Sequence, residues 1–317
     1  MTTLPILDSA PFLTGPGPAE ARALLESLER HGAARLVLPS GFARLASAGL
    51  LHAEAFFARP EAEKAEICIT DSPHHRGWSV MNTERDWREQ VHLGREWPAA
   101  EGGPDWARLE GPNRWPVPDR GFRAAMEAHL EAGAALGGAL MQALAPFFGI
   151  RPEVHDPVGS YTLLKLIAYH PQRPGGAARP GVAAHVDFSL LTLVAQDGEG
   201  GLEVQEPGGG WVLVPPEAGT LILHPGELLE ALSGGRIRAV PHRVTHAGTS
   251  KARLSLPLFF NPPLEAWIHP RSAPPRSELG SHVHRVLTGL EGPFRFGEAE
   301  WRRKGLNRWC ATCCEGA

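Results

Sequence analysis

The segment Tyr161-Thr-Leu-Leu-Lys-Leu-Ile-Ala-Tyr169 marks the change from helical to β-type periodicity in this chain. Successive side chains of a strand point to opposite faces of a sheet. Alternation therefore predicts that one face of this segment carries Leu163, Lys165, Ile167 and Tyr169. A lysine in such an apolar run either extends from an outer face to solvent or faces an anionic ligand inside a barrel. Tyr169 could hydrogen-bond the same anion.

Further short β-rich runs follow this segment, separated by Gly, Pro and Asp turns. They are Ser189–Ala195, Leu202–Gln205, Trp211–Val214, Thr220–His224, Arg236–Val240 and Arg253–Phe260. Several short strands at regular spacing indicate an all-β sandwich or barrel.

The first 150 residues have mainly helical periodicity. Apolar residues recur at helical spacing in 18–31, 43–58 and 119–145, and Asp119 is the expected N-cap of the last helix. The Trp- and Pro-rich residues 70–118 are expected to form a long irregular connection, and residues 281–310 a further helix. We therefore expect a helical N-terminal region (1–150), a β-barrel catalytic domain (151–264) and a helical C-terminal extension (265–317).

Composition narrows the classes of partner. A chain of 317 residues with net charge -4 and a pI near 6.4 gives no sign of a nucleic-acid or membrane-surface partner. Neither a signal peptide nor a membrane span is evident, so we expect a cytoplasmic location. A disulfide framework is not expected from Cys68, Cys310, Cys313 and Cys314, since three of the four crowd the C-terminal tail.

The run His185-Val-Asp187 carries the first sign of chemistry. In an extended strand, residues i and i+2 share a face, so this imidazole and carboxylate can converge on one point. His242, in Pro-His-Arg-Val, supplies a third candidate ligand. Two histidines and one carboxylate on one side of a metal leave open positions, as in non-haem Fe(II) oxygenases. Taken alone, His-X-Asp is also a common surface pair.

Arg253-Leu-Ser255 is the second element of the candidate site. Strand alternation places the guanidinium and the hydroxyl on one face, where they could bind a carboxylate. The alternative is a solvated charge at a strand edge. The apolar run that follows favours a buried strand, in which an unpaired arginine would be costly.

Together these motifs resemble the isopenicillin N synthase-like family of Fe(II)/2-oxoglutarate oxygenases. The resemblance is carried by residues 158–263 and extends to Leu4-Pro-Ile-Leu-Asp8 and to the end of the helix after Phe56. The matching runs include His185-Val-Asp187, Leu191-Thr-Leu-Val-Ala-Gln-Asp197, Pro225-Gly-Glu-Leu-Leu, Pro241-His242-Arg-Val, and Arg253-Leu-Ser255 ending in Phe-Phe-Asn-Pro. The resemblance implies a double-stranded β-helix, or jelly-roll, barrel flanked by helices.

Carried over by position, the resemblance implies a role for each matched residue. His185, Asp187 and His242 resemble the iron ligands, and Arg253, Ser255 and Tyr169 resemble the residues that bind 2-oxoglutarate. Lys165 stands where relatives carry Arg or Lys near the iron-side substrates, and we expect it to take part in binding the co-substrate. His246 is the rival for the third ligand. His170 and the run His224-Pro-Gly-Glu227 depart from the family pattern, and neither departure is expected to touch the ligand set.

The activity implied is that of a non-haem Fe(II)- and 2-oxoglutarate-dependent dioxygenase. Such an enzyme uses O2 and an iron-oxo intermediate to oxidise a small molecule, releasing succinate and CO2. The outcome could be hydroxylation, desaturation, cyclisation or fragmentation. One alternative is an Fe(II) oxidase of the same fold that uses no 2-oxoglutarate; another is a non-catalytic barrel that binds a small acid or a metal.

Residues for the prime substrate are expected in the segment before the barrel. Arg76 and Trp78 lie in a Gly-aromatic run that in relatives folds over the barrel mouth. If Arg76 holds a substrate group, the substrate is anionic. Alternatively, the charged residues that follow, 84–89, pair with one another and fix a loop to the surface.

Overall fold

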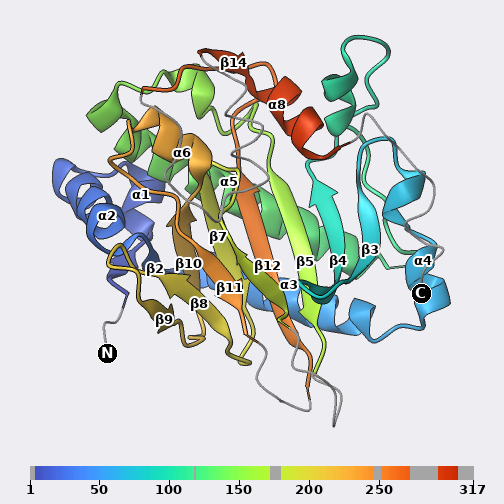
Figure 1. Cartoon of the computed structure of the whole chain (residues 1–317). Coiled ribbons are helices and arrows are strands. Elements are labelled where there is room, and N and C mark those ends of the chain that lie inside the picture. The colour runs from blue at the N-terminus through green and yellow to red at the C-terminus, as the bar shows by residue number, and fades with distance from the viewer. Residues whose placement is uncertain (1–3, 118, 172–179, 246–250, 272–291, 306–317) are drawn as a thin grey trace.

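Two facing β-sheets form the core of the protein (Figure 1). The computed structural model describes residues 4–117, 119–171, 180–245, 251–271 and 292–305. The larger sheet has eight strands in the order β1 (Ile6–Asp8), β2 (Ala34–Val37), β10 (Thr220–Pro225), β7 (Leu191–Gln196), β12 (Arg253–Phe260), β5 (Leu163–Tyr169), β4 (Trp87–Gly94) and β3 (Gly77–Asn82). The smaller sheet has the order β6 (Val182–His185), β11 (His242–Val244), β8 (Leu202–Gln205) and β9 (Trp211–Leu213). The expected jelly-roll core flanked by helices is confirmed.

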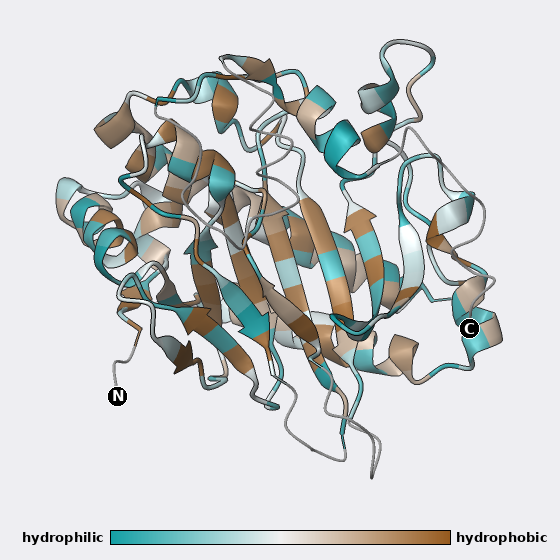
Figure 2. Cartoon of the chain, viewed as in Figure 1, coloured by the Kyte–Doolittle hydropathy of each residue, from teal (hydrophilic) through white to brown (hydrophobic). Residues whose placement is uncertain are grey.

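Helices cover the outer face of the larger sheet. Helices α3 (Ser40–Phe57) and α5 (Arg120–Phe148) contact β5, β7 and β12 and lie behind them in Figure 1. On β5, Leu164 and Leu166 join the core shared with these helices. A Cβ on Gly137 of α5 would lie 2.7 Å from the Phe260 ring, so glycine permits this close approach of helix and strand. Figure 2 shows β5, β7 and β12 largely in hydrophobic colours, as expected of strands with both faces covered.

The remaining described helices lie around the edges of the barrel. They are α1 (Ala10–Thr14), α2 (Pro18–His31), α4 (Glu61–Ala65), α6 (Glu227–Leu232) and α8 (Phe296–Arg303). Helix α8 contacts the 3-10 helix η2 (Asp105–Leu109) and follows a short ribbon of β13 (Trp267–Ile268) and β14 (Phe294–Arg295). None of the described helices combines the length and apolar character needed to cross a bilayer.

Several local predictions are confirmed. The expected helix at 18–31 and the expected strands at 202–205 and 253–260 have the same bounds in the structure. Asp119 caps α5, because its side chain accepts a hydrogen bond from the Phe122 amide. On β5, Lys165 lies on the interior side of the barrel with its three apolar neighbours of the same face.

Other local predictions are wrong. The expected irregular connection at 70–118 contains β3 and β4, and the first 150 residues contribute four strands to the larger sheet. Residues 236–240 form no strand, and the strand in this region is β11. Cys68 is disulfide-bonded, contrary to expectation. Cys310, Cys313 and Cys314, and much of the helix expected at 281–310, lie outside the described residues; α8 forms its central part.

Candidate active site

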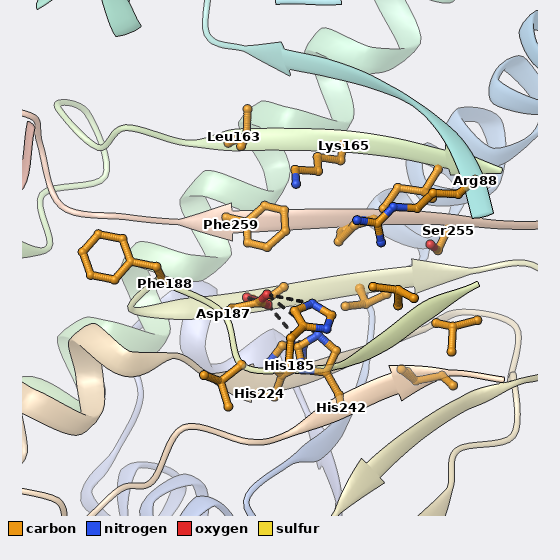
Figure 3. A pocket seen from close by; sticks show the side chains of 18 of the residues that line it. Arg88, Leu163, Lys165, His185, Asp187, Phe188, His224, His242, Ser255 and Phe259 are labelled. Carbon is orange, nitrogen blue, oxygen red and sulfur yellow. Dashed lines mark hydrogen bonds and ion pairs between the residues drawn. The ribbon is translucent and has the colours of Figure 1, made fainter. Parts of the chain in front are cut away.

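A cavity of about 180 Å³ lies inside the barrel and contains the residues singled out from the sequence. Its walls come from β5, β12, β6, β11 and β10, with α8 at one end. Figure 3 shows Asp187, His185, His224 and His242 together on one side of the cavity. Lys165, Arg88 and Ser255 lie on the opposite side, toward β5 and β12.

The three expected ligands converge. His185 ends β6 and pairs with His242, the first residue of β11, while Asp187 follows the end of β6. One potential ligand atom from each residue lies within 4.8 Å of the other two. The Asp187 Oδ1 atom is 3.6 Å from His185 Nε2 and 3.8 Å from His242 Nε2. The two strand ends and the adjoining segment therefore place two imidazoles and a carboxylate around one point.

Backbone carbonyls fix the orientation of both imidazoles. His185 Nδ1 lies 2.9 Å from the Ala183 carbonyl, and His242 Nδ1 lies 3.1 Å from the Val240 carbonyl. A carbonyl can only accept, so each Nδ1 donates and each Nε2 keeps its lone pair free. This is the arrangement in which a histidine is oriented to ligate a metal through Nε2.

The carboxylate of Asp187 is also oriented. Thr192 Oγ1 donates a 2.7 Å hydrogen bond to Oδ2, which leaves Oδ1 facing the histidines. Burial alone would raise the pKa of Asp187, but His242, His224, His185 and the Thr192 hydroxyl lower it below its usual range. The donor set is thus two imidazole nitrogens and one carboxylate oxygen, which fits a divalent first-row metal.

Gly226 packs directly under the Asp187 backbone. A Cβ at this position would lie 2.6 Å from the Asp187 carbonyl oxygen and 2.5 Å from that of Ser189. The Glu227 amide donates a 2.9 Å hydrogen bond to the same Asp187 carbonyl. The Pro-Gly-Glu turn therefore supports the segment that holds the carboxylate.

His224 was expected not to touch the ligand set, and this expectation is wrong. Its Nε2 lies 3.7 Å from Asp187 Oδ2, and its ring centroid lies 4.4 Å from that of His242. It faces inward because β10 pairs with β7 and sets His224 opposite Thr192, the residue that holds Asp187. Complete burial lowers the pKa of His224 to about 3, so the ring is neutral.

Arg253, Ser255 and Tyr169 meet at the other end of the cavity, on the neighbouring strands β12 and β5. The Arg253 side chain is buried and lies 4.9 Å from the Tyr169 ring. Its Nη2 donates to Gln196 Oε1 at 3.1 Å, whereas Nε and Nη1 have no partner among the described residues. The buried guanidinium therefore keeps donors that are available to a carboxylate at this wall of the cavity.

Lys165 lines the same cavity, with its Nζ 5.2 Å from the Phe259 ring centroid. Burial, together with Arg88, Lys304 and Arg303, lowers the pKa of this lysine to about 7. In the part of the chain that the structure describes, no hydrogen bond or ion pair of Lys165 is found. Such a lysine gains from an anionic ligand, which would restore its charge.

Arg76 and Trp78 are not among the residues that line the cavity. The Arg76 guanidinium is fully buried and donates to the carbonyls of His74 and Leu109 and to the Tyr161 hydroxyl. Trp78 Nε1 donates to Glu89 at 2.8 Å. The structure therefore does not bring these two residues together with the triad. His246 lies outside the described residues.

Sequence reasoning missed some of the cavity residues, which are Arg88 of β4, Asn261 after β12, and Glu300 and Arg303 of α8. Arg88 falls among the charges expected to fix a surface loop, because its strand was not predicted. The Phe-Phe-Asn-Pro run was considered only as a match to the family, and no role was predicted for Asn261. The signal available was its position directly after the strand that carries Arg253 and Ser255.

Comparisons with known proteins agree with this geometry. Residues 161–262 match the 2OG-Fe(II) oxygenase superfamily, and residues 4–118 match the non-haem dioxygenase N-terminal region described from morphine synthesis. A 2-oxoglutarate-dependent dioxygenase of Gibberella zeae is 30% identical over 81% of this chain and 74% of its own. The 2-oxoglutarate-Fe(II) type oxidoreductase hxnY of Emericella nidulans is 28% identical over 82% of this chain and 80% of its own.

Solved structures show the same fold. A full-length protein of Neurospora crassa, crystallised in complex with α-KG and 5-formyluracil, superposes with a TM-score of 0.73. The two chains are 25% identical, and the match covers 95% of each.

Proposed function

This chain belongs to the 2OG-Fe(II) oxygenase superfamily, and we propose that His185, Asp187 and His242 are the residues that hold its iron. The protein is an Fe(II)- and 2-oxoglutarate-dependent oxygenase that acts on a small molecule. The convergence of one atom from each residue within 4.8 Å supports this assignment most strongly. When bound, Fe(II) would supply the O2-dependent oxidation.

The protein's own residues orient the metal ligands and bind the co-substrate. Ala183 and Val240 hold the two histidines through their carbonyls, and Thr192 holds the carboxylate. The Arg253 guanidinium, with Ser255 and Tyr169 beside it, would donate to the distal carboxylate of 2-oxoglutarate. The buried walls around these groups exclude water, which strengthens each of these polar contacts.

The finer proposal concerns the substrate. Lys165, Arg88 and Arg303 bring three cationic side chains to the cavity. Glu300 neutralises Arg303, and Asp86 lies 3.6 Å from Arg88, so Lys165 keeps an unmatched charge. This balance favours a substrate that carries an anionic group.

Calorimetric titration with Mn(II) under nitrogen, followed by 2-oxoglutarate, tests the site. His185→Ala, Asp187→Ala and His242→Ala should each abolish tight Mn(II) binding, because each removes one of three protein ligands. His224→Asn and His246→Ala should retain it. Equal loss of Mn(II) binding in His246→Ala and His242→Ala would refute the ligand assignment.

A further inference from the structure

A second polar corner of the cavity lies at the end nearest α8 and includes Lys165, to which the proposed function assigns the anionic group of the substrate. It is formed where β5 and β12 run side by side and Phe259 pairs with Leu163. Lys165 of β5 and Asn261, just beyond β12, both line it, and Phe188 and Phe259 provide apolar walls. Figure 3 shows Lys165, Leu163 and Phe259 near one another, with Phe188 farther along the cavity and Ser255 toward the opposite end.

The amide of Asn261 can present only its oxygen. Its Nδ2 donates to the Tyr161 carbonyl at 3.0 Å and to the Phe259 carbonyl at 3.3 Å. Carbonyls cannot donate, so these two contacts settle which end of the amide is the nitrogen. Asn261 Oδ1 is buried and has no partner among the described residues. A buried acceptor without a donor is destabilising, so this oxygen is available to a donor on a ligand.

Lys165 supplies the complementary feature. It is the cation of this corner that no carboxylate of the described chain pairs with, because Glu300 engages Arg303 at 2.7 Å and Lys304 at 3.4 Å. Its Nζ lies near Phe259, at the level of Leu163, whereas Asn261 bonds to Tyr161, two residues further along. Lys165 and Asn261 are therefore a donor and an acceptor of the same cavity that no described contact joins.

We propose that Lys165 and Asn261 together select the prime substrate, as a small planar acid that carries an N–H or O–H donor some ångströms from its anionic group. The anion would bind Lys165, the donor would bind Asn261 Oδ1, and the ring would lie against Phe188 and Phe259. At about 180 Å³ the cavity is smaller than the roughly 300–1,000 Å³ usual for ligand pockets. The inference rests on the proposed function, since it places this ligand beside the iron and 2-oxoglutarate.

Two matched pairs of probes test the proposal, namely 4-hydroxybenzoate with benzoate and pyrrole-2-carboxylate with furan-2-carboxylate. Binding is measured by calorimetry to the protein loaded with Mn(II) and 2-oxoglutarate under nitrogen. In at least one pair, the wild-type protein should bind the member with a donor about tenfold more tightly, the contribution of one hydrogen bond to a buried acceptor. Asn261→Ala should reduce that preference to within about twofold. A preference is a ratio within one variant, so a partly unfolded sample does not change it.

Lys165→Met should weaken the binding of all four acids and leave intact the preference for the member of a pair that carries a donor. Asn261→Ala should bind Mn(II) and 2-oxoglutarate as the wild type does, which separates failure of this proposal from failure of the proposed function. The proposal is overturned if no pair shows a preference in the wild type, if the preference survives in Asn261→Ala, or if Lys165→Met weakens 2-oxoglutarate instead.

Discussion

Thr192 donates a hydrogen bond of 2.7 Å to Asp187 Oδ2, and the other oxygen of that carboxylate lies between two histidine Nε2 atoms. The two oxygens of this carboxylate therefore have different contacts. Oδ2 is hydrogen-bonded to Thr192 of β7, and Oδ1 faces the proposed metal position. Without the anchor, Asp187 could rotate toward His224, whose Nε2 is 3.7 Å from Oδ2.

Thr192→Val keeps the shape of the side chain and removes the hydroxyl. We expect Mn(II) affinity to fall about 10- to 100-fold, the usual effect of losing a group that orients a metal ligand. Calorimetric titration with Mn(II) measures this change in affinity. Thr162→Val is the matched control, because Thr162 is similarly buried but bonds to Ser160. Unchanged Mn(II) affinity in Thr192→Val would show that the hydroxyl does not orient Asp187.

Gly226→Ala tests the backbone support of the same ligand. The new methyl would lie 2.6 Å from the Asp187 carbonyl oxygen, so the segment that carries the carboxylate must shift. We expect weaker Mn(II) binding and a lower melting temperature. Gly41→Ala is the control, since a Cβ there meets nothing within 4 Å. If the two variants behave alike, the close packing under Asp187 has no role in metal binding.

Arg253→Met tests the co-substrate site. Loss of a charge-assisted pair from a buried pocket costs on the order of 2–5 kcal/mol, so the Kd for 2-oxoglutarate should rise about thirtyfold or more. Ser255→Ala and Tyr169→Phe each remove one hydrogen bond and should raise it less than about tenfold. Arg243→Met is the control, because Arg243 pairs with Glu203 outside the cavity. Equal effects of Arg253→Met and Arg243→Met would contradict the assignment.

Glu89 predicts a pH dependence of stability. Burial by itself would raise the pKa of this carboxyl, but hydrogen bonds from His170, Lys64 and Trp78 lower it below its usual value. A lowered pKa in the folded state stabilises the protein above the unfolded value, about 4.3, and this stability is lost as pH falls through the folded pKa.

Glu89→Gln should therefore destabilise the protein at pH 7 and flatten the fall in unfolding free energy below about pH 4.3. Lys64→Met, which leaves the carboxylate buried without its cation, should cost about 3–5 kcal/mol at pH 7. Urea unfolding across a pH series measures both. Glu63→Gln on the exposed side of α4 is the control. Parallel pH profiles for wild type and Glu89→Gln would contradict this account.

The parts of the site that the sequence predicts are those with a clear local pattern. Alternation on β5 predicts that Lys165 and Tyr169 share one face, and in the structure both line the cavity. Alternation alone left open whether that face points into the barrel or outward. The meeting of His185, Asp187 and His242 follows from ordered family motifs, although Asp187 lies beyond the end of β6. That both histidines are oriented by carbonyls two residues before them cannot be read from residue types.

The strands β3 and β4 could not be predicted, and the reason is physical. On β4, Arg88, Gln90 and His92 alternate with Trp87, Glu89 and Val91, so polar residues occur on both faces. Glu89 can be buried because Lys64 and Trp78 donate hydrogen bonds to its carboxylate, and only the folded chain reveals these contacts. Arg76 was expected at the substrate pocket for a similar reason, since its buried position depends on backbone carbonyls distant in sequence.

The most direct test of the central claim is the release of labelled CO2 from 2-oxoglutarate carrying ¹⁴C in its C1 carboxylate. With Fe(II) and O2, the wild-type protein should release ¹⁴CO2 and an equal amount of succinate, and Asp187→Ala should release neither. Addition of a true substrate should raise the rate. Consumption of O2 with substrate and Fe(II) but without any 2-oxoglutarate, or release of ¹⁴CO2 by Asp187→Ala at the wild-type rate, would contradict the claim.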